Sequence, residues 1–172
     1  MTPDRALFIG RFQPFHHGHR SVVEKLLAGH GEVIICVGSA ETPMGKENPF
    51  SAGERIEMIR AAFTSGQLSR ILIIPVRDVN DHSRWVGHVK SLVPSFSAVY
   101  SNNEVVAGLF HKAGIPLKPV EFFDRGPKEG RLIRELMAKG DAEWKKHVPE
   151  GTVKFIERIK GEERIAGLSK PV

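Results

Sequence analysis

The sequence predicts an α/β protein with a doubly wound, Rossmann-like parallel sheet and a small helical appendage at its C-terminal end. Three observations predict this class: short runs rich in β-branched residues, helical spacing of apolar residues between them, and a last third without a clear strand. Two runs, VIICV at 33–37 and ILII at 71–74, do not alternate with polar residues. Strands buried on both faces have this pattern, which favours a parallel sheet covered by helices.

Strands are expected at residues 6–9, 33–37, 71–74, 98–100 and 115–120. The last run contains Pro116 and Pro119, which lack a backbone donor and so favour an edge position. Apolar residues recur at helical spacing in the segments 22–27, 56–63, 85–93 and 105–110. Strand and helix therefore alternate four times, as they do in doubly wound domains.

Local capping signals support two of these helices. Ser51 and Glu54 have the spacing of a capping box, which begins the helix over 56–63 a few residues earlier. Asn102 or Asn103 can cap the helix that contains 105–110.

The last third has helical patterns at 132–137 and 153–159. Because 172 residues suit one domain and would be cramped for two, we expect a single domain over 1–172. Its α/β core would cover 1–124 and its helical subregion 125–172. The loops at 39–50 and 122–128 are long enough to suggest functional roles.

Composition excludes several classes of protein. The single cysteine, Cys36, excludes a disulfide framework and a cysteine-rich metal site, and its apolar strand predicts a core position. No apolar run approaches the roughly 20 residues of a membrane-spanning helix, and the N-terminus lacks a secretory layout, so we expect a cytoplasmic protein without a membrane partner. A net charge of +5 favours an anionic partner without choosing among nucleic acid, nucleotide and phosphometabolite.

The loop after the first strand, GRFQPFHHGH at 10–19, is the strongest functional signal. Ligands of open α/β sheets bind beyond the carboxyl ends of the strands. Gly10 permits a sharp turn, and Gly18 permits close approach of backbone to a ligand at the start of a helix, where N–H groups attract anions. His16 and His19, three residues apart, could both point at one phosphate group.

Other readings of this loop fit less well. The GxxxxGK[ST] pattern of a P-loop and the GxGxxG pattern of a dinucleotide site are both absent. A zinc site on His16 and His19 would lack an obvious third ligand nearby. A single loop histidine is usually a surface or capping residue, but three histidines beside an arginine and two glycines favour an anion site.

The same loop matches the GxFxPxHxGH pattern of the HxGH nucleotidyltransferase superfamily, and its form GRFQPFHxGH resembles the archaeal-type nicotinamide mononucleotide (NMN) adenylyltransferases. The resemblance continues in register over roughly residues 6–165, through GSA at 38–40, ENPFSAGER at 47–55, IPVRD at 74–78, WVGH at 85–88 and VYS at 99–101. It implies the reaction of ATP with NMN to give NAD and pyrophosphate, by direct in-line attack and without a covalent intermediate. It also implies a homo-oligomer, such as a hexamer, and Mg²⁺ held through the ATP phosphates rather than by a protein site.

The resemblance also implies roles for individual residues. The catalytic residues would be His16, His19 and Arg11, all acting on phosphate oxygens. ATP would contact Gly10, Arg11, Phe12, His16, Gly18, His19, Tyr100, Ser101, Asn102, Arg131 and Arg134. NMN would contact Phe12, Gly38, Ser39, Asp78 and Trp85.

Each acceptor-side residue also has a structural interpretation. Trp85 would stack its indole on the cationic nicotinamide ring, which is favourable by about 0.5–2 kcal/mol, or serve as a core aromatic of its helix. Asp78 would hold the carboxamide region or the cation, or cap a turn. Phe12 would wall the nicotinamide pocket or fill the core. Gly38 and Ser39 would contact the substrate or form a plain turn.

The chain departs from the family where relatives carry Ser-Gly-Thr-x-x-Arg at the start of a late helix. The matching stretch, EGRLIR at 129–134, keeps the glycine and Arg134 but has neither hydroxyl. Glu129 would repel a triphosphate unless it turned away or paired with Arg125 or Lys128. Arg131 lies one helical turn from Arg134 and could face the same anion.

Three other functions remain open on the sequence. The same transfer could use a pantetheine or flavin phosphate as acceptor, although Trp85 and Asp78 favour a cationic ring. A nucleic-acid-binding protein would suit a pI near 9.5, but aromatic residues make up only 8% and the basic residues form no tract. A nucleotide sensor could have lost activity through the changes at Glu129 and Arg131.

Overall fold

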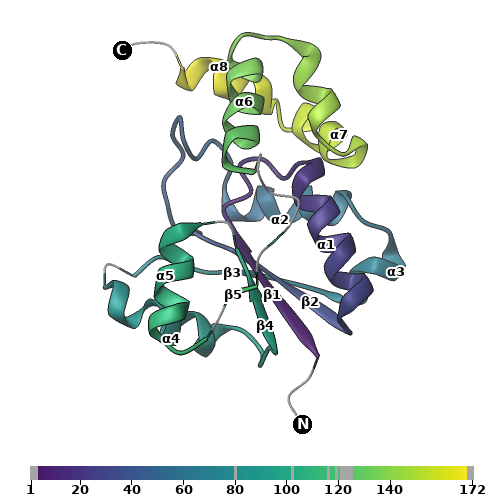
Figure 1. Cartoon of the computed structure of the whole chain (residues 1–172). Coiled ribbons are helices and arrows are strands. Elements are labelled where there is room, and N and C mark those ends of the chain that lie inside the picture. The colour runs from purple at the N-terminus through teal and green to yellow at the C-terminus, as the bar shows by residue number, and fades with distance from the viewer. Residues whose placement is uncertain are drawn as a thin grey trace.

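The structure is a computed structural model that describes residues 4–79, 81–101, 103–115, 117–118, 120 and 126–169, with side chains from 129 onward in the last segment. An α/β body and a group of C-terminal helices make up the molecule (Figure 1). The C-terminal helices lie beyond the end of the sheet toward which the first strand runs.

All strands of the sheet are parallel, in the order β3-β2-β1-β4-β5. Their bounds are β1 Arg5–Gly10, β2 Glu32–Val37, β3 Ile71–Pro75, β4 Ala98–Tyr100 and β5 Leu117–Lys118. The expected strands are therefore confirmed, and the last one lies at an edge, although its two prolines fall outside the described residues. The chain leaves β1 toward β2 on one side and later adds β4 on the other, so the topological switch point lies at the carboxyl ends of β1 and β4.

Helices cover both faces of the sheet. Their bounds are α1 His17–Gly29, α2 Ala52–Ala61, α3 Ser65–Leu68, α4 His82–Leu92, α5 Glu104–Lys112, α6 Gly126–Ala138, the 3₁₀ helix η1 Ala142–His147, α7 Glu150–Arg158 and α8 Gly161–Leu168. Buried residues of α1 and α2 pack in one core cluster, and those of α4 and α5 pack in the other, on the opposite face of the sheet (Figure 1). This is the predicted doubly wound arrangement.

Helix starts follow their capping residues. The Ser51 side chain accepts the backbone N–H of Glu54, and the Glu54 carboxylate accepts the N–H of Ser51, which confirms the expected capping box. Asn103 caps α5. The helix that contains the apolar residues at 85–93 begins nearly one turn before them, because Asp81 accepts the N–H of Ser83 and α4 starts at His82. The short α3 and η1 and the separate α8 were not expected.

The C-terminal helices share a core with the α/β body. Ile133 of α6, Trp144 of η1 and Ile165 of α8 belong to the same buried cluster as Phe8 and Phe15. Polar contacts join the same parts, since Arg164 makes a bidentate ion pair with Glu54 at 2.7 and 2.8 Å. The predicted appendage is thus packed on the body.

Two further expectations concern the body. Cys36 is fully buried in β2, as expected for a core residue, and burial together with the nearby Asp78 raises the pKa of its thiol to about 12. Within the described ranges, no helix is both long and apolar enough to cross a bilayer.

The close contact between α2 and α7 depends on Gly151. A β-carbon at this position would overlap the carbonyl oxygen of Ala61, which belongs to backbone and cannot rotate away. We expect Gly151→Ala to destabilise the protein by about 3 kcal/mol, because the two helices must separate. Gly108 is its matched control, since it lies inside α5 with nothing within 4 Å of an added β-carbon.

For Gly108→Ala we expect a gain of about 0.5–1 kcal/mol from helix propensity. Urea unfolding of both variants measures the two effects. Equal signs for the two substitutions would contradict the assignment of close packing to Gly151.

Candidate active site

The loop at 10–19 turns tightly at the end of β1. Phe12 has a left-handed backbone conformation (φ 54°), and its ring folds back over Gly10, where a β-carbon would come within 2.9 Å of the ring. The buried Phe12 ring also meets the ring of His19 edge-on, with centroids 4.8 Å apart. Gly10 and Phe12 therefore shape the loop that holds the histidines.

His16 and His19 cap α1 reciprocally. Nδ1 of His16 accepts the backbone N–H of His19 at 3.4 Å, and Nδ1 of His19 accepts the N–H of His16 at 3.3 Å. Their rings stack with centroids 3.5 Å apart. Because Nδ1 accepts in both rings, the proton of each neutral ring lies on Nε2. Two Nε2–H donors thus stand at the N-terminus of α1, where backbone N–H groups and the helix dipole already favour an anion.

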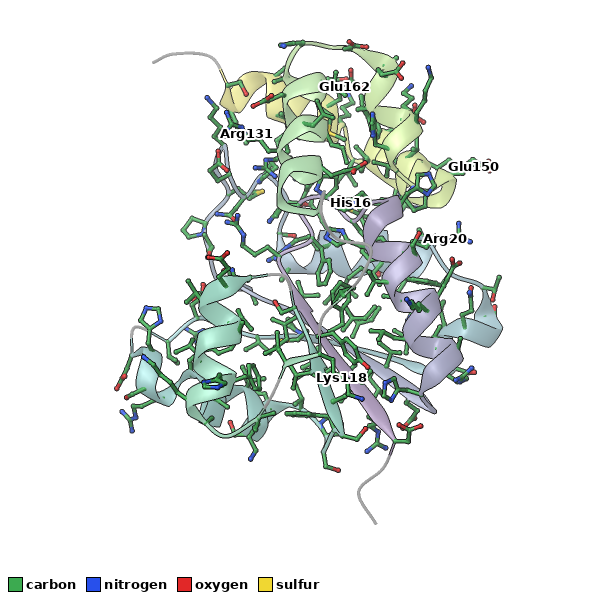
Figure 2. All side chains as sticks on the ribbon, viewed as in Figure 1. His16, Arg20, Lys118, Arg131, Glu150 and Glu162 are labelled. Carbon is green, nitrogen blue, oxygen red and sulfur yellow. The ribbon has the colours of Figure 1, made fainter. Side chains whose placement is uncertain are left out.

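Burial keeps His19 neutral. It lowers the pKa of His19 well below the usual 6.5, and the neighbouring His16 lowers it further. A β-carbon at Gly18 would lie 3.1 Å from the ring of His16, so the glycine leaves room for that ring at the helix start. Figure 2 shows His16 at the junction between α1 and the C-terminal helices.

A cavity of about 490 Å³ opens beside this pair, at the carboxyl ends of β1 and β4. Among the residues expected to contact ATP, those that line it are Gly10, Arg11, Phe12, His16, His19, Ser101 and Arg134. The cavity is also lined by Gln13, Asn103 and Glu104, which no sequence pattern marked as ligand contacts. The cavity therefore occupies the switch point, where the fold predicts a ligand.

Of the other residues expected at ATP, the three that the structure describes do not line this cavity. Gly18 sits behind the His16 ring, and Asn102 falls outside the described residues. The hydroxyl of Tyr100 lies 2.9 Å from Nε2 of His30, at the far end of α1. Arg131 is 76% exposed and pairs with Glu135 at 2.7 Å. Their contact with ATP stays a prediction.

Arg134 reaches the loop from α6. Its Nη1 donates to the carbonyl oxygen of Gln13 at 2.8 Å, and its Nη2 pairs with Glu47 at 2.9 Å. Burial lowers the pKa of Arg134, an effect that Glu47 opposes. No sequence pattern predicted a role for Glu47, because it stood out only as the first residue of the ENPFSAGER segment. A smaller hollow of about 250 Å³ adjoins this pair and is lined by Lys46 and Arg131 as well.

Glu129 has a partner that the sequence did not suggest. Its carboxylate lies 3.0 Å from Nδ1 of His147, and it does not line the cavity. The side chains of Arg125 and Lys128, its expected partners, are outside the described residues. The predicted repulsion of a triphosphate is thus reduced by the direction of the Glu129 side chain.

The residues expected to bind NMN follow β2 and β3, except Phe12. The N–H of Gly38 donates to the carbonyl of Gly10 at 2.9 Å, and Ser39 has a left-handed backbone (φ 49°). Asp78 is exposed, and its N–H donates to Glu41. Trp85 is half-buried and meets Phe110 edge-on at 5.9 Å, as the core interpretation expects. Of the five, only Phe12 lines the 490 Å³ cavity.

Arg55 was missed as well. It lies on the buried face of α2 with Met58 and Ile59, and its guanidinium donates to the carbonyls of Arg11 at 2.7 Å and Gly38 at 2.8 Å. An arginine at an apolar position of an amphipathic helix was the signal that could have revealed it.

In the part of the chain that the structure describes, no three His, Cys, Asp or Glu side chains converge into a candidate metal site.

A parallel α/β sheet with paired histidines at its switch point defines the class of nucleotidyltransferases, and residues 7–80 match the cytidylyltransferase-like family model. Curated relatives share one particular activity within this class. The chain is 40% identical over 163 residues to a nicotinamide-nucleotide adenylyltransferase of Caldivirga maquilingensis (94% of this chain, 92% of the relative) and 45% identical over 163 residues to that of Pyrobaculum aerophilum, with the same coverage. It is 41% identical over 170 residues to that of Archaeoglobus fulgidus (96% and 97%). The chain belongs to the nicotinamide-nucleotide adenylyltransferase family.

Solved structures agree on the fold. A bifunctional NMN adenylyltransferase/ADP-ribose pyrophosphatase from Francisella tularensis, complexed with AMP and a manganese ion, superposes with a TM-score of 0.77 at 23% identity. The match covers 98% of this chain and 52% of that one, so this chain spans about half its length. A putative nicotinate-nucleotide adenylyltransferase from Vibrio parahaemolyticus gives 0.61 at 13% identity, covering 94% and 96%.

Proposed function

We propose that this protein transfers the adenylyl group of ATP to NMN, forming NAD and pyrophosphate. The observation that carries the proposal is the reciprocal cap of His16 and His19, whose rings stack on each other and both line the switch-point cavity. The membership of the chain in its family selects the reaction.

The chemistry needs alignment and charge neutralisation more than a base. The NMN phosphate is already anionic at neutral pH, so it attacks the α-phosphorus of ATP in line while pyrophosphate leaves on the opposite side. His16 and His19 donate to oxygens of the triphosphate, where negative charge grows on the bridging oxygen. Arg11 and Arg134, which line the same cavity, bind the phosphate tail.

Mg²⁺ belongs to the substrate in this proposal. It would enter bound to ATP and would neutralise part of the charge on the phosphates, and a magnesium ion in a nucleotide site needs few protein ligands. We also propose that the protein acts in the cytoplasm as a homo-oligomer, without nucleic-acid or membrane partners. Sedimentation analysis of the purified protein tests the assembly.

On the acceptor side we propose that Trp85 stacks on the nicotinamide ring and that Gly38, Ser39 and Asp78 contact NMN. Gly38 and Ser39 follow β2, Asp78 follows β3, and Trp85 lies in the helix α4 after β3. The carboxyl ends of both strands lie at the same edge of the sheet as the cavity. The stacking requires the exposed part of Trp85, since its other part packs on Phe110.

The test offers MgATP with NMN, flavin mononucleotide or phosphopantetheine and measures pyrophosphate and the adenylylated product. We expect release with NMN and formation of NAD. Release with flavin mononucleotide or phosphopantetheine but not with NMN would select the other acceptor, and nucleotide binding without release would favour a sensor.

Glu47 competes with phosphate for Arg134 in this proposal. Its carboxylate, 66% exposed, occupies Nη2 of Arg134 and must leave before a phosphate oxygen takes that position. Exposed pairs are worth about 0.2–1 kcal/mol, so we expect Glu47→Gln to lower the KM for ATP about 1.4- to fivefold with kcat unchanged. Initial rates over a range of ATP concentrations measure the effect.

Glu24→Gln is the control for this variant, because Glu24 pairs with Arg20 at 2.9 Å on α1 and neither residue lines the cavity or the adjoining hollow. We expect its KM for ATP to match that of the wild type. A higher KM in Glu47→Gln would mean that Glu47 holds Arg134 in its productive position instead.

A further inference from the structure

The guanidinium of Arg55 lies beneath both loops of the candidate site. Its side chain is 1% exposed. Nη1 donates to the carbonyl oxygens of Arg11 and Gly38, Nη2 donates to that of Ser39 at 3.2 Å, and Nε donates to that of Ser51 at 3.3 Å. One side chain thus binds three segments: the loop at 10–19, called the phosphate loop below, the residues 38 and 39 after β2, called the acceptor loop, and the start of α2.

Arg55 keeps its charge despite its burial. Burial and the nearby Arg11 lower the pKa of its guanidinium to about 10, while Asp78 and Glu41 oppose the shift. The group is therefore protonated at neutral pH, and carbonyl dipoles solvate it. A buried cation costs free energy unless its donors are bonded, so the planar five-donor fork is what makes the position tolerable.

Apart from that of Ser51, the carbonyls that Arg55 binds belong to two loops, one proposed to contact ATP and the other proposed to contact NMN. Arg11 lies in the same loop as His16. The exposed side chain of Arg11 makes a long hydrogen bond, at 3.4 Å, to Asn48. Gly38 and Ser39 lie in the loop proposed to contact NMN. The position of the Arg11 side chain therefore depends on its backbone, which Arg55 holds at 2.7 Å.

We propose that Arg55 is a positioning residue for the adenylyl transfer, aligning the phosphate loop with the acceptor loop through their backbone carbonyls. The inference rests on the proposed function and deepens it. In-line attack requires the two phosphates to approach in one geometry, and a displacement of about 1 Å can cost about 100-fold in rate.

Arg70 offers a matched control. The guanidinium of Arg55 binds four backbone carbonyls, and that of the exposed Arg70 binds three, those of Leu27, His30 and Gly31, at 2.6–2.8 Å. Those carbonyls precede β2, at the amino end of the sheet and away from the cavity. Lysine cannot reproduce either set, because a single ammonium group does not span a planar fork of acceptors.

The experiment compares Arg55→Lys with Arg70→Lys in the full chain. We expect both variants to lose several degrees in thermal midpoint. Only Arg55→Lys should lower kcat, by about 10- to 100-fold, with smaller changes in KM for ATP and NMN. Equal kcat losses in the two variants, or none in Arg55→Lys, would overturn the proposal.

Hydrogen exchange without substrates separates this proposal from the proposed function. In Arg55→Lys, amides of both 10–19 and 38–51 should exchange faster, whereas Arg70→Lys should leave them unchanged. Unchanged exchange in either loop of Arg55→Lys overturns the positioning role. A wild type that makes no NAD overturns the function instead, whatever the loops do.

Arg55→Gln, which retains an N–H donor, replaces Arg55→Lys if the lysine variant does not fold. The expectations are the same. If neither variant folds while Arg70→Lys does, Arg55 is needed for folding itself and the proposal fails.

Discussion

Replacing His19 by alanine is expected to lower turnover about 10²- to 10³-fold while the protein stays folded. The variant removes one Nε2–H donor from the place where charge grows on the triphosphate, and loss of one such donor typically costs this much in kcat. It also removes the acceptor for the N–H of His16, a capping bond worth about 1 kcal/mol. That is a small part of the 5–15 kcal/mol by which domains are usually stable.

His17→Ala is the control for this substitution. His17 belongs to the same loop but is exposed and does not line the cavity. We expect its turnover to stay within a factor of two of the wild type. NAD formation and thermal unfolding of both variants test the pair, and a His19→Ala enzyme with undiminished turnover would contradict the role assigned to the imidazole.

The lowered pKa of His19 also predicts a pH dependence of stability. Below pH 6.5 the unfolded chain binds a proton at His19 that the folded protein does not bind, so this group makes the free energy of unfolding fall as pH falls. Above 6.5 it contributes no slope. Urea unfolding at pH 7.5 and 5.5 should therefore show a larger acid loss for the wild type than for His19→Gln.

The sequence predicted what lies in contiguous segments. The loop at 10–19 holds the cap, the glycines and both histidines within ten residues, and VIICV and ILII predicted buried strands because burial on both faces leaves no polar alternation. The class of the fold and the core of the candidate site followed from these segments alone.

Contacts between distant segments could not be predicted in this way. Arg55 binds the carbonyl of Arg11, 44 residues away in sequence, and Arg134 pairs with Glu47, 87 residues away. The motif placed Tyr100 near a strand end but not the direction of its side chain, whose hydroxyl meets His30 instead. Each depends on how loops and helices pack, which apolar spacing does not encode.

The largest effect on stability is expected for Trp144→Ala. Trp144 is completely buried, its indole N–H donates to Glu162 at 3.2 Å, and it packs in the cluster that joins the C-terminal helices to the α/β body. Truncating a core tryptophan costs about 3–5 kcal/mol, through lost burial and the cavity left behind. Urea unfolding followed by circular dichroism measures the loss.

Trp85→Ala is the informative contrast, because the chain has only these two tryptophans. Trp85 is half-buried, so we expect a smaller loss of stability but a higher KM for NMN, whereas Trp144→Ala should leave that KM nearly unchanged. Since Trp144 belongs to a core shared by both parts of 1–172, the wild type should unfold in one cooperative transition. Two separate transitions, in which the sheet stays folded after the first, would instead show that the C-terminal helices unfold as a unit of their own.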